Sequence, residues 1–217
     1  MLQVDSLEHA YGSERVLYGV YLTCEPGEIV GVVGRNGCGK TTMLKSLFGS
    51  LAATHVHLEI DGAITHRAYQ TGIVEYLPQE PFLPRGVKVR RAIRLTLPGH
   101  KQQEELTHEE TIAPHLGKRV RALSGGEQRY IEVLLVSLRD APYVLLDEPF
   151  TEIEPIHREP LRAWIRKIAR EHNRGFIITD HAYRDVLECA DRIVVLAEGV
   201  TRQADGEDDL RRWGYTP

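Results

Sequence analysis

Cysteine is scarce in this chain of 217 residues, which contains three. Cys24, Cys38 and Cys189 are too few and too scattered for a disulfide framework or a Cys-x-x-Cys metal site, so we expect reduced thiols in a cytosol. The ten histidines are scattered as well. His55 and His57 share one side of an expected strand, but a metal site needs further ligands that the sequence does not suggest, which favours a solvated edge.

Long apolar runs and an excess of one charge are also missing. No run approaches the roughly 18 apolar residues that span a bilayer, and the first residues lack the basic and apolar regions of a secretion signal. Lysine and arginine number 27 against 31 aspartates and glutamates, so the net charge of −4 gives no reason to expect a nucleic-acid partner, and we expect none. The length allows one sizeable core with a smaller inserted subdomain.

A glycine-rich loop, here called the phosphate loop, is the first strong signal. It follows an apolar run at residues 29–33 and precedes a segment with helical spacing, which is the order that a phosphate-binding loop requires. Its glycines let backbone N–H groups face an anion, Lys40 can reach the β- and γ-phosphates, and Thr41 can offer its hydroxyl to Mg²⁺. The loop comprises Gly34, Arg35, Asn36, Gly37, Cys38, Gly39, Lys40, Thr41 and Thr42. The chain is therefore expected to bind a nucleoside triphosphate.

The segments on either side of this loop have simple patterns. Leu44, Leu47, Phe48 and Leu51 have the spacing of one apolar helix face, which predicts a helix that includes all four. Apolar residues near the N-terminus predict strands, and Tyr11 precedes a glycine at the turn between them. An exposed tyrosine offers a stacking face for a base, but a tyrosine in this place is more often a plain turn residue.

Residue 79 begins a region of different character. Gln79 follows an apolar strand and can ligate Mg²⁺ or hold water through its carbonyl oxygen, although glutamine is common at strand ends. Prolines and a basic cluster follow, which indicate an insertion. The cluster is a solvated face or a contact for nucleic acid or anionic lipid, and the lack of interleaved aromatics argues against binding of single strands. Its members are Arg85, Lys88, Arg90, Arg91 and Arg94.

A serine–glycine segment is the second strong signal. Ser124 and Glu127 have capping-box spacing, and Ile131, Leu134, Leu135 and Leu138 follow on one helix face, so a helix is expected to begin here. Capping alone does not explain glycines in the first turn, where each weakens a helix by roughly 0.5–1 kcal/mol. Gly125 and Gly126 leave backbone N–H groups bare at a helix N-terminus, where an anion binds well.

Two carboxylates end the third signal, an apolar run at residues 143–146. The run predicts a strand buried on both faces of a parallel sheet, which places Asp147 at the edge where ligands bind. Asp147 can hold Mg²⁺, and Glu148 can polarise the water that attacks a γ-phosphate. A further buried strand at residues 176–179 ends in Asp180 and His181, and the histidine can contact a phosphate oxygen or position Glu148. A helix at residues 161–168 and a strand at 192–196 complete an α/β alternation.

Together these motifs resemble the ATP-binding subunits of ATP-binding cassette (ABC) transporters. The resemblance covers nearly the whole chain, and its most specific element is the phosphate loop combined with Leu123-Ser124-Gly125-Gly126-Glu127. It implies an α/β P-loop NTPase core with a mainly parallel sheet, an N-terminal antiparallel β subdomain and a small inserted helical subdomain. The core would comprise residues 1–78 and 124–217, and the insertion residues 79–123.

The resemblance also implies roles for single residues. Tyr11 would stack on adenine, Gln79 would bind Mg²⁺ and sense a membrane partner, and Glu148 and His181 would serve hydrolysis. Ser124, Gly125, Gly126 and Glu127 of one subunit would contact the ATP held by the phosphate loop of a second subunit, in a homodimer or a heterodimer. The insertion would dock onto a transmembrane permease subunit, with the chain peripheral on the cytoplasmic face of the membrane.

Three features depart from the family pattern. Ile153 and Glu154 replace a usual Leu-Asp pair at the dimer interface, and Tyr130 replaces an arginine. Cys38 stands where alanine or serine is usual. Because a helix N-terminus lowers the pKa of a thiol, we expect Cys38 to alkylate readily and ATP to protect it.

Two further details of the sequence concern the branch of the family and the end of the chain. Residues 77–80 and 178–181 look most like the branch that contains lipopolysaccharide-export and branched-chain amino-acid ATPases. The acidic segment at residues 205–209 is expected to start a helix or to be a solvated end.

Other functions fit less well. A cytosolic ABC ATPase acting on nucleic acid or ribosomes would carry a long coiled-coil insertion or a second cassette, and this chain has neither. A scaffold that binds ATP without hydrolysis is disfavoured by the presence of both Glu148 and His181. The leading hypothesis is a Mg²⁺-dependent ATPase that powers transport.

Overall fold

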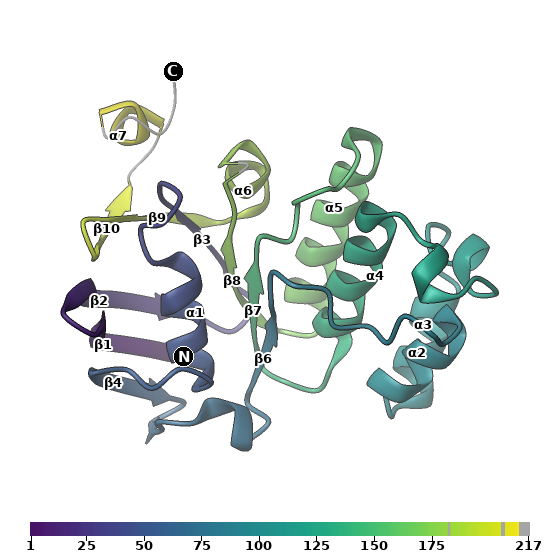
Figure 1. Ribbon diagram of the computed structural model, residues 1–217, viewed down its shortest axis with the longest axis horizontal. Helices are drawn as coiled ribbons and strands as arrows, with labels where there is room; N and C mark the ends of the chain where they lie inside the picture. Colours follow the sequence, from purple (N-terminus) through teal and green to yellow (C-terminus); the bar gives the residue numbers. More distant parts are fainter. Residues whose placement is uncertain (182, 205–206, 213–217) are drawn as a thin grey trace.

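A ten-stranded sheet runs through the computed structural model, which describes residues 1–181, 183–204 and 207–212 (Figure 1). The strand order is β5-β4-β1-β2-β10-β9-β3-β8-β7-β6. The strands are β1 (Leu2–Tyr11), β2 (Glu14–Cys24), β3 (Ile29–Val33), β4 (His55–Ile60), β5 (Ala63–Ile64), β6 (Val74–Leu77), β7 (Tyr143–Asp147), β8 (Gly175–Thr179), β9 (Arg192–Ala197) and β10 (Val200–Ala204).

The sheet has a parallel and an antiparallel half. Strands β6, β7, β8, β3 and β9 pair with one another in parallel, whereas β1, β2, β4 and β5 pair with one another in antiparallel fashion. Strand β10 joins the two halves, antiparallel to β9 and parallel to β2. Every residue of β3, β7 and β8 is buried, as expected of apolar runs covered on both faces. The predicted fold class, an α/β core with a mainly parallel sheet and an N-terminal antiparallel part, is confirmed.

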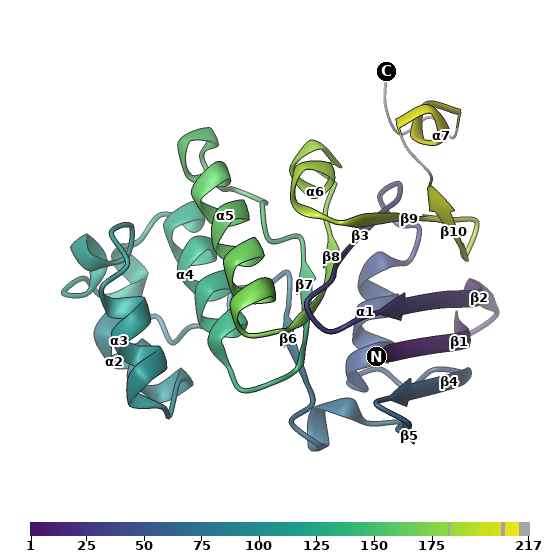
Figure 2. The same cartoon turned by 180° about the vertical axis from the view of Figure 1, so that it is seen from behind.

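Helices cover the two faces of the parallel half. Helix α1 (Lys40–Phe48) buries Met43, Leu44 and Leu47 in a core shared with β1, β2 and β3. The second core lies on the other face, under α4 (Gly125–Leu138), α5 (Pro155–Glu171) and α6 (Tyr183–Cys189), and Figure 2 shows these helices from behind. The parallel strands thus lie between α1 and the group formed by α4 to α6. A last helix, α7 (Glu207–Arg212), begins inside the acidic segment, whose first two residues, 205 and 206, lie outside the described residues.

Helix α1 ends earlier than its apolar spacing predicts. Gly49 has a φ of 89°, in the left-handed region, and its N–H closes the helix on the carbonyls of Lys45 and Ser46. Leu51 therefore lies beyond the helix, and its assignment to the helical face was wrong. The spacing rule counted apolar residues and ignored the glycine, which ends a helix at little steric cost.

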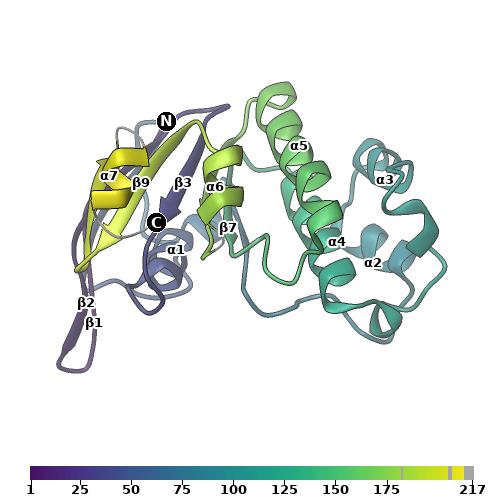
Figure 3. The same cartoon turned by 90° about the horizontal axis from the view of Figure 1, so that it is seen from above.

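Residues 79–123 contain α2 (Val89–Thr96), α3 (His100–Thr107) and the short turns η2 (Ala113–His115) and η3 (Val120–Ala122); another such turn, η1 (Ala68–Gln70), lies before β6. Seen from above, α2 and α3 form one end of the molecule, beyond α4 (Figure 3). Their buried apolar residues join the core beneath α4, while all five residues of the basic cluster are exposed. Among the described residues, no helix combines the length and the hydropathy needed to span a membrane.

Candidate nucleotide site

The phosphate loop joins β3 to α1. Gly39 has a φ of 105°, and a Cβ on Gly34 would lie 2.6 Å from the carbonyl oxygen of Leu196, so both positions require glycine. Lys40, the first residue of α1, is largely buried, and its Nζ donates to the carbonyl oxygens of Gly34 at 2.8 Å and Arg35 at 3.2 Å. The ammonium group is thereby held over the loop, where the bridging oxygens of a polyphosphate would meet it.

A pocket of about 380 Å³ opens beside this loop. Its lining contains Tyr11, Val16, Asn36, Gly37, Gly39, Lys40, Thr41, Thr42, Gln79 and Glu148. Tyr11 is 53% exposed and packs edge-on against His9, and its hydroxyl lies 3.3 Å from Thr42 Oγ1. These residues are far apart in the chain, and the sequence predicted separate roles for them in binding the base, the phosphates, the metal and the attacking water. In the structure they share one cavity.

Asp147 is fully buried at the end of β7 and is surrounded by hydroxyl donors. Thr41 Oγ1 donates to Asp147 Oδ1 at 3.2 Å, and Thr179 Oγ1 donates to the same oxygen at 2.9 Å. Tyr76 donates to Oδ2 at 3.0 Å. Burial raises the pKa of Asp147 above its ordinary value, and these three hydrogen bonds oppose the rise. Thr41, Asp147 and Gln79 offer only oxygen ligands, the kind that Mg²⁺ prefers, so these residues fit that ion.

A protein-only metal cage is absent from the described part of the chain. No group of three or more histidine, cysteine, aspartate or glutamate side chains gathers there in a way that could hold a metal ion. A cation bound by one or two protein oxygens and by substrate phosphates is the usual arrangement for Mg²⁺ in nucleotide sites.

Glu148 adopts an unusual backbone conformation immediately after Asp147. Its φ is 54°, a left-handed value that costs a residue with a side chain roughly 1–2 kcal/mol. Its N–H donates to the carbonyl of Thr179 at 2.7 Å, and its Oε2 accepts from Thr151 Oγ1 at 3.2 Å. His181 Nδ1 lies 3.5 Å from the same Oε2. Strain of this kind concentrates at functional sites, and here it accompanies a carboxylate directed into the pocket.

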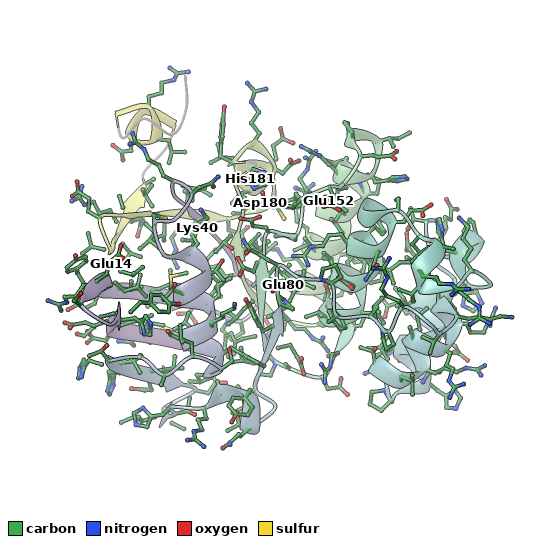
Figure 4. The ribbon with its side chains drawn as sticks, viewed as in Figure 1. Glu14, Lys40, Glu80, Glu152, Asp180 and His181 are labelled. Atoms are coloured by element: carbon green, nitrogen blue, oxygen red, sulfur yellow. The ribbon has the colours of Figure 1, made fainter. Side chains whose placement is uncertain are left out.

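His181 is joined to the site through Asp180. Figure 4 labels both residues, next to each other above the central strands. Asp180 is buried, and its Oδ2 accepts from the N–H of Phe150 at 2.9 Å. The histidine side chain remains half exposed. Its Nδ1 lies 3.5 Å from Glu148 Oε2, which agrees with the expectation that it can reach Glu148.

None of residues 124–127, here called the Ser124 turn, lines this pocket, although Gly125 lines a smaller neighbouring cavity with Gln79 and Glu148. The predicted capping box is confirmed, because Glu127 N–H donates to Ser124 Oγ at 3.1 Å and Ser124 N–H donates to Glu127 Oε2 at 2.8 Å. That second bond lowers the pKa of Glu127. A Cβ on Gly126 would lie 2.4 Å from the carbonyl oxygen of Glu152, so the packing of this turn already requires a glycine here. Within one chain the turn does not meet Lys40.

The family departures other than Cys38 lie beside the Ser124 turn. Tyr130 is buried and packs edge-on against His157, with ring centroids 6.0 Å apart, and Glu154 precedes α5. With Ser124 they line a small pocket of about 110 Å³. This pocket opens beside the turn and shares no lining residue with the larger pocket.

The expectation of a readily ionised Cys38 was wrong. Burial raises the pKa of its thiol above the ordinary 9.0, and the opposing effects of Lys40 and of backbone N–H groups are smaller. The helix begins at Lys40, two residues beyond Cys38, and the sulfur packs into the loop next to Gly34. The proximity of a helix N-terminus was recognised in the sequence, but the loss of solvent was not.

Three site residues escaped sequence analysis. Thr179 is the direct register partner of Asp147 across β8 and β7, and Tyr76 lies on the next strand. Arg129, on α4, is buried and donates to the backbone carbonyls of Pro78, Asp147 and Glu148. The available signal for Arg129 was Glu132, an opposite charge three residues later between two apolar residues, a spacing typical of an ion pair on one helix face.

Comparison with known proteins places these features in context. A family model described as "ABC transporter" matches residues 17–151. An uncharacterised ABC transporter ATP-binding protein of Rhizobium meliloti is 36% identical over 89% of this chain and 76% of its own length. The lipopolysaccharide export system ATP-binding protein LptB of Haemophilus influenzae is 30% identical over 98% and 95%. A dimeric bacterial ABC transporter cassette has the same fold, with a TM-score of 0.81 at 20% identity over 95% of this chain and 100% of that one.

Proposed function

This chain belongs to the ABC transporter family as an ATP-binding, ATP-hydrolysing subunit, and we propose that it drives a separate permease through ATP-dependent pairing of two such subunits. The observation that carries the proposal is the pocket that joins Tyr11, the phosphate loop, Gln79 and Glu148. A base, a triphosphate and an attacking water each find a suitable group there.

Binding of ATP rests on three kinds of contact. Tyr11 offers an exposed ring for stacking on adenine. The N–H groups of the phosphate loop and the Lys40 ammonium hold the phosphates, which replace the carbonyl partners of Nζ. Thr41, Asp147 and Gln79 would hold Mg²⁺. When bound, this ion neutralises charge on the β- and γ-phosphates.

Hydrolysis depends on Glu148 as general base. Its carboxylate lines the pocket and accepts a proton from water placed against the γ-phosphate. Thr151 and His181 both contact the same carboxylate oxygen, Oε2, at 3.2 Å and 3.5 Å. The left-handed backbone of Glu148 and the bond from its N–H to Thr179 keep the side chain at the strand end.

The Ser124 turn acts on the ATP of the partner subunit. Ser124, Gly125, Gly126 and Glu127 form a capped helix N-terminus, which favours an anion, yet they lie away from Lys40 of the same chain. A second copy of the cassette, or a related subunit, would bring its own phosphate loop to this turn. Closure then requires an intact triphosphate, and hydrolysis permits opening.

Transport requires a membrane partner. We assign residues 79–123 to a helical subdomain that docks onto a transmembrane permease, with residues 1–78 and 124–217 as the ATPase core. The exposed basic cluster lies in this subdomain, which suits a partner or lipid surface of opposite charge. The chain would accordingly act at the cytoplasmic face of a membrane.

The role of Glu148 is tested with Glu148→Gln. We expect turnover to fall by roughly 100-fold or more while MgATP still binds, so that an ATP-bound dimer accumulates in size-exclusion chromatography. Glu171→Gln, at an exposed carboxylate near the end of α5, is the matched control and should keep wild-type turnover. Comparable rates for Glu148→Gln and wild type would remove Glu148 from this role.

The shared site is tested by mixing two inactive variants. Lys40→Ala cannot hold the phosphates, and Ser124→Arg cannot close on the partner's ATP. If the site is formed between subunits, a mixed dimer contains one intact site, and the mixture should recover part of the wild-type turnover. A mixture as inactive as its components would contradict pairing through the Ser124 turn.

A further inference from the structure

Two side chains of helix α4 form hydrogen bonds to the backbone before and after Gln79. Near the start of the helix, Arg129 Nη1 donates to the carbonyl of Pro78 at 2.6 Å. One turn later, Glu132 Oε1 accepts from the N–H groups of Phe82 at 3.0 Å and Leu83 at 3.1 Å. The residues between these anchors, 79–81, are here called the Gln79 loop. Both of its ends are therefore tied to one rigid element.

The same guanidinium reaches the end of β7. Arg129 Nη2 donates to the carbonyls of Asp147 and Glu148, and Nε donates to the carbonyl of Glu148 at 3.3 Å. A single side chain thus joins the end of β6 to the backbone of Asp147 and Glu148 at the end of β7. An arginine can do this because its planar group presents five N–H donors in a rigid arrangement, whereas a lysine ammonium is a single point.

Burial makes these contacts strong. Arg129 is 6% exposed and Glu132 is fully buried, and unpaired charges at such depth are costly. Glu132 Oε1 also accepts from Gln128 Nε2 at 2.9 Å, so that oxygen has three donors. Its second oxygen, Oε2, has no hydrogen-bond partner in the described structure and lies 3.9 Å from Arg129 Nη1. Arg129 consequently has another acceptor within reach if Pro78 moves.

We propose that Arg129 and Glu132 are positioning residues that link the Gln79 loop to Glu148, so that displacement of the loop alters the placement of the catalytic carboxylate. The inference rests on the proposed function for the identity of the reaction. Arg129 and Glu132 are here called the clamp. Helix α4 begins with the Ser124 turn, and the clamp therefore connects three regions: the Gln79 loop at the start of residues 79–123, the hydrolytic residues and the surface proposed to meet the partner's ATP.

Arg129→Lys and Glu132→Gln test the two halves of the clamp. Neither residue lines the ATP pocket, so KM for ATP should stay near wild type in both variants. In Arg129→Lys, the single ammonium cannot hold all the carbonyls, and we expect kcat to fall by on the order of 10- to 100-fold. Glu132→Gln keeps the shape but loses the charge, and the amides of Phe82 and Leu83 should exchange hydrogen roughly tenfold faster, with kcat reduced.

The matched control is Arg139→Lys at the other end of α4. Arg139 pairs with Glu75 at 2.9 Å and is 44% exposed, so its replacement should leave kcat, KM and the two amides unchanged. Melting temperatures show whether the variants are folded. If Arg129→Lys does not fold, Glu132→Gln alone decides the matter, because it is nearly isosteric.

The outcomes separate this inference from the proposed function. Folded variants with wild-type kcat, or Glu132→Gln with unchanged exchange at Phe82 and Leu83, would overturn the clamp while leaving the ATPase intact. A rise of KM together with a lower melting temperature would show that Arg129 has only a structural role, and this result would also overturn the clamp. Absence of turnover in the wild-type chain would instead contradict the proposed function, and the exchange measurement would still test the clamp.

Discussion

The phenol of Tyr76 donates a hydrogen bond to Asp147 Oδ2 at 3.0 Å, across two adjacent parallel strands. Burial of Tyr76 raises the pKa of its hydroxyl, and the nearby carboxylate raises it further, so the proton stays on the phenol. The interaction leaves Oδ1 to two threonines, Thr41 and Thr179. Oδ2 is therefore held by the sheet alone, whereas Oδ1 is shared between the sheet and the phosphate loop.

Tyr76→Phe removes this anchor without changing the ring. A buried carboxylate oxygen would lose its donor, which costs about 1–3 kcal/mol. We expect the free energy of unfolding in urea to fall by that amount without nucleotide, and by less with MgATP. Tyr69→Phe is the control, since Tyr69 is 42% exposed and its hydroxyl accepts a surface hydrogen bond from the neighbouring Gln70 Nε2 at 3.0 Å. Equal stabilities of wild type and Tyr76→Phe would show that the bond contributes nothing.

The end of helix α1 gives a second prediction, based on two glycines with similar backbones. Gly49 and Gly62 have φ values of 89° and 83°. A Cβ on Gly49 would lie 2.7 Å from Arg67 Cα, whereas one on Gly62 would meet nothing within 4 Å. Gly62→Ala should cost roughly 1 kcal/mol of unfolding free energy from backbone strain alone, and Gly49→Ala about 1–3 kcal/mol more from overlap with backbone.

Urea denaturation of both variants separates strain from contact. A larger loss for Gly49→Ala would confirm that the segment around Arg67 packs against the helix end. Equal losses would mean that the helix end and that segment move apart at low cost, and the close contact would then have no energetic weight.

Local patterns in the sequence predicted the framework well. The apolar runs gave β3, β7 and β8 as buried parallel strands, and the serine–glutamate spacing gave the first residue of α4, because each signal lies within a few consecutive residues. The predicted end of α1 was wrong because the apolar spacing was followed without regard to the glycine within it. Apolar spacing continued past Gly49, but the backbone of that residue had already left the helical region.

The site was predictable only where it is local. The phosphate loop and the pair Asp147 and Glu148 appear as short motifs, so sequence analysis found them. Thr179 and Arg129 reach the same carboxylate and its backbone from other elements, and their roles depend on strand register and on the packing of α4. The spacing of residues along the sequence shows neither the strand register nor this packing. The shared pocket of Tyr11, Gln79 and Glu148 likewise became visible only in three dimensions.

Alkylation of Cys38 provides the last prediction. Its pKa lies above the ordinary 9.0 because of burial, so the thiolate is scarcer at neutral pH than in a free thiol. The labelling rate should be lower than that of N-acetylcysteine at pH 7.5. Since the thiolate fraction grows tenfold per pH unit below the pKa, the rate should still be rising at pH 9, where a free thiol begins to level off.

Iodoacetamide labelling followed by peptide mass spectrometry measures this rate. Cys24 and Cys189 are buried, and burial raises the pKa of Cys189 to about 12, so Cys38 should label first, and Cys38→Ser should leave only a slow background. MgATP should slow the labelling further, because phosphates held by the loop cover the sulfur. Rates that level off below pH 9 would contradict the effect of burial, and equal rates with and without MgATP would mean that the nucleotide does not occupy the loop beside Cys38.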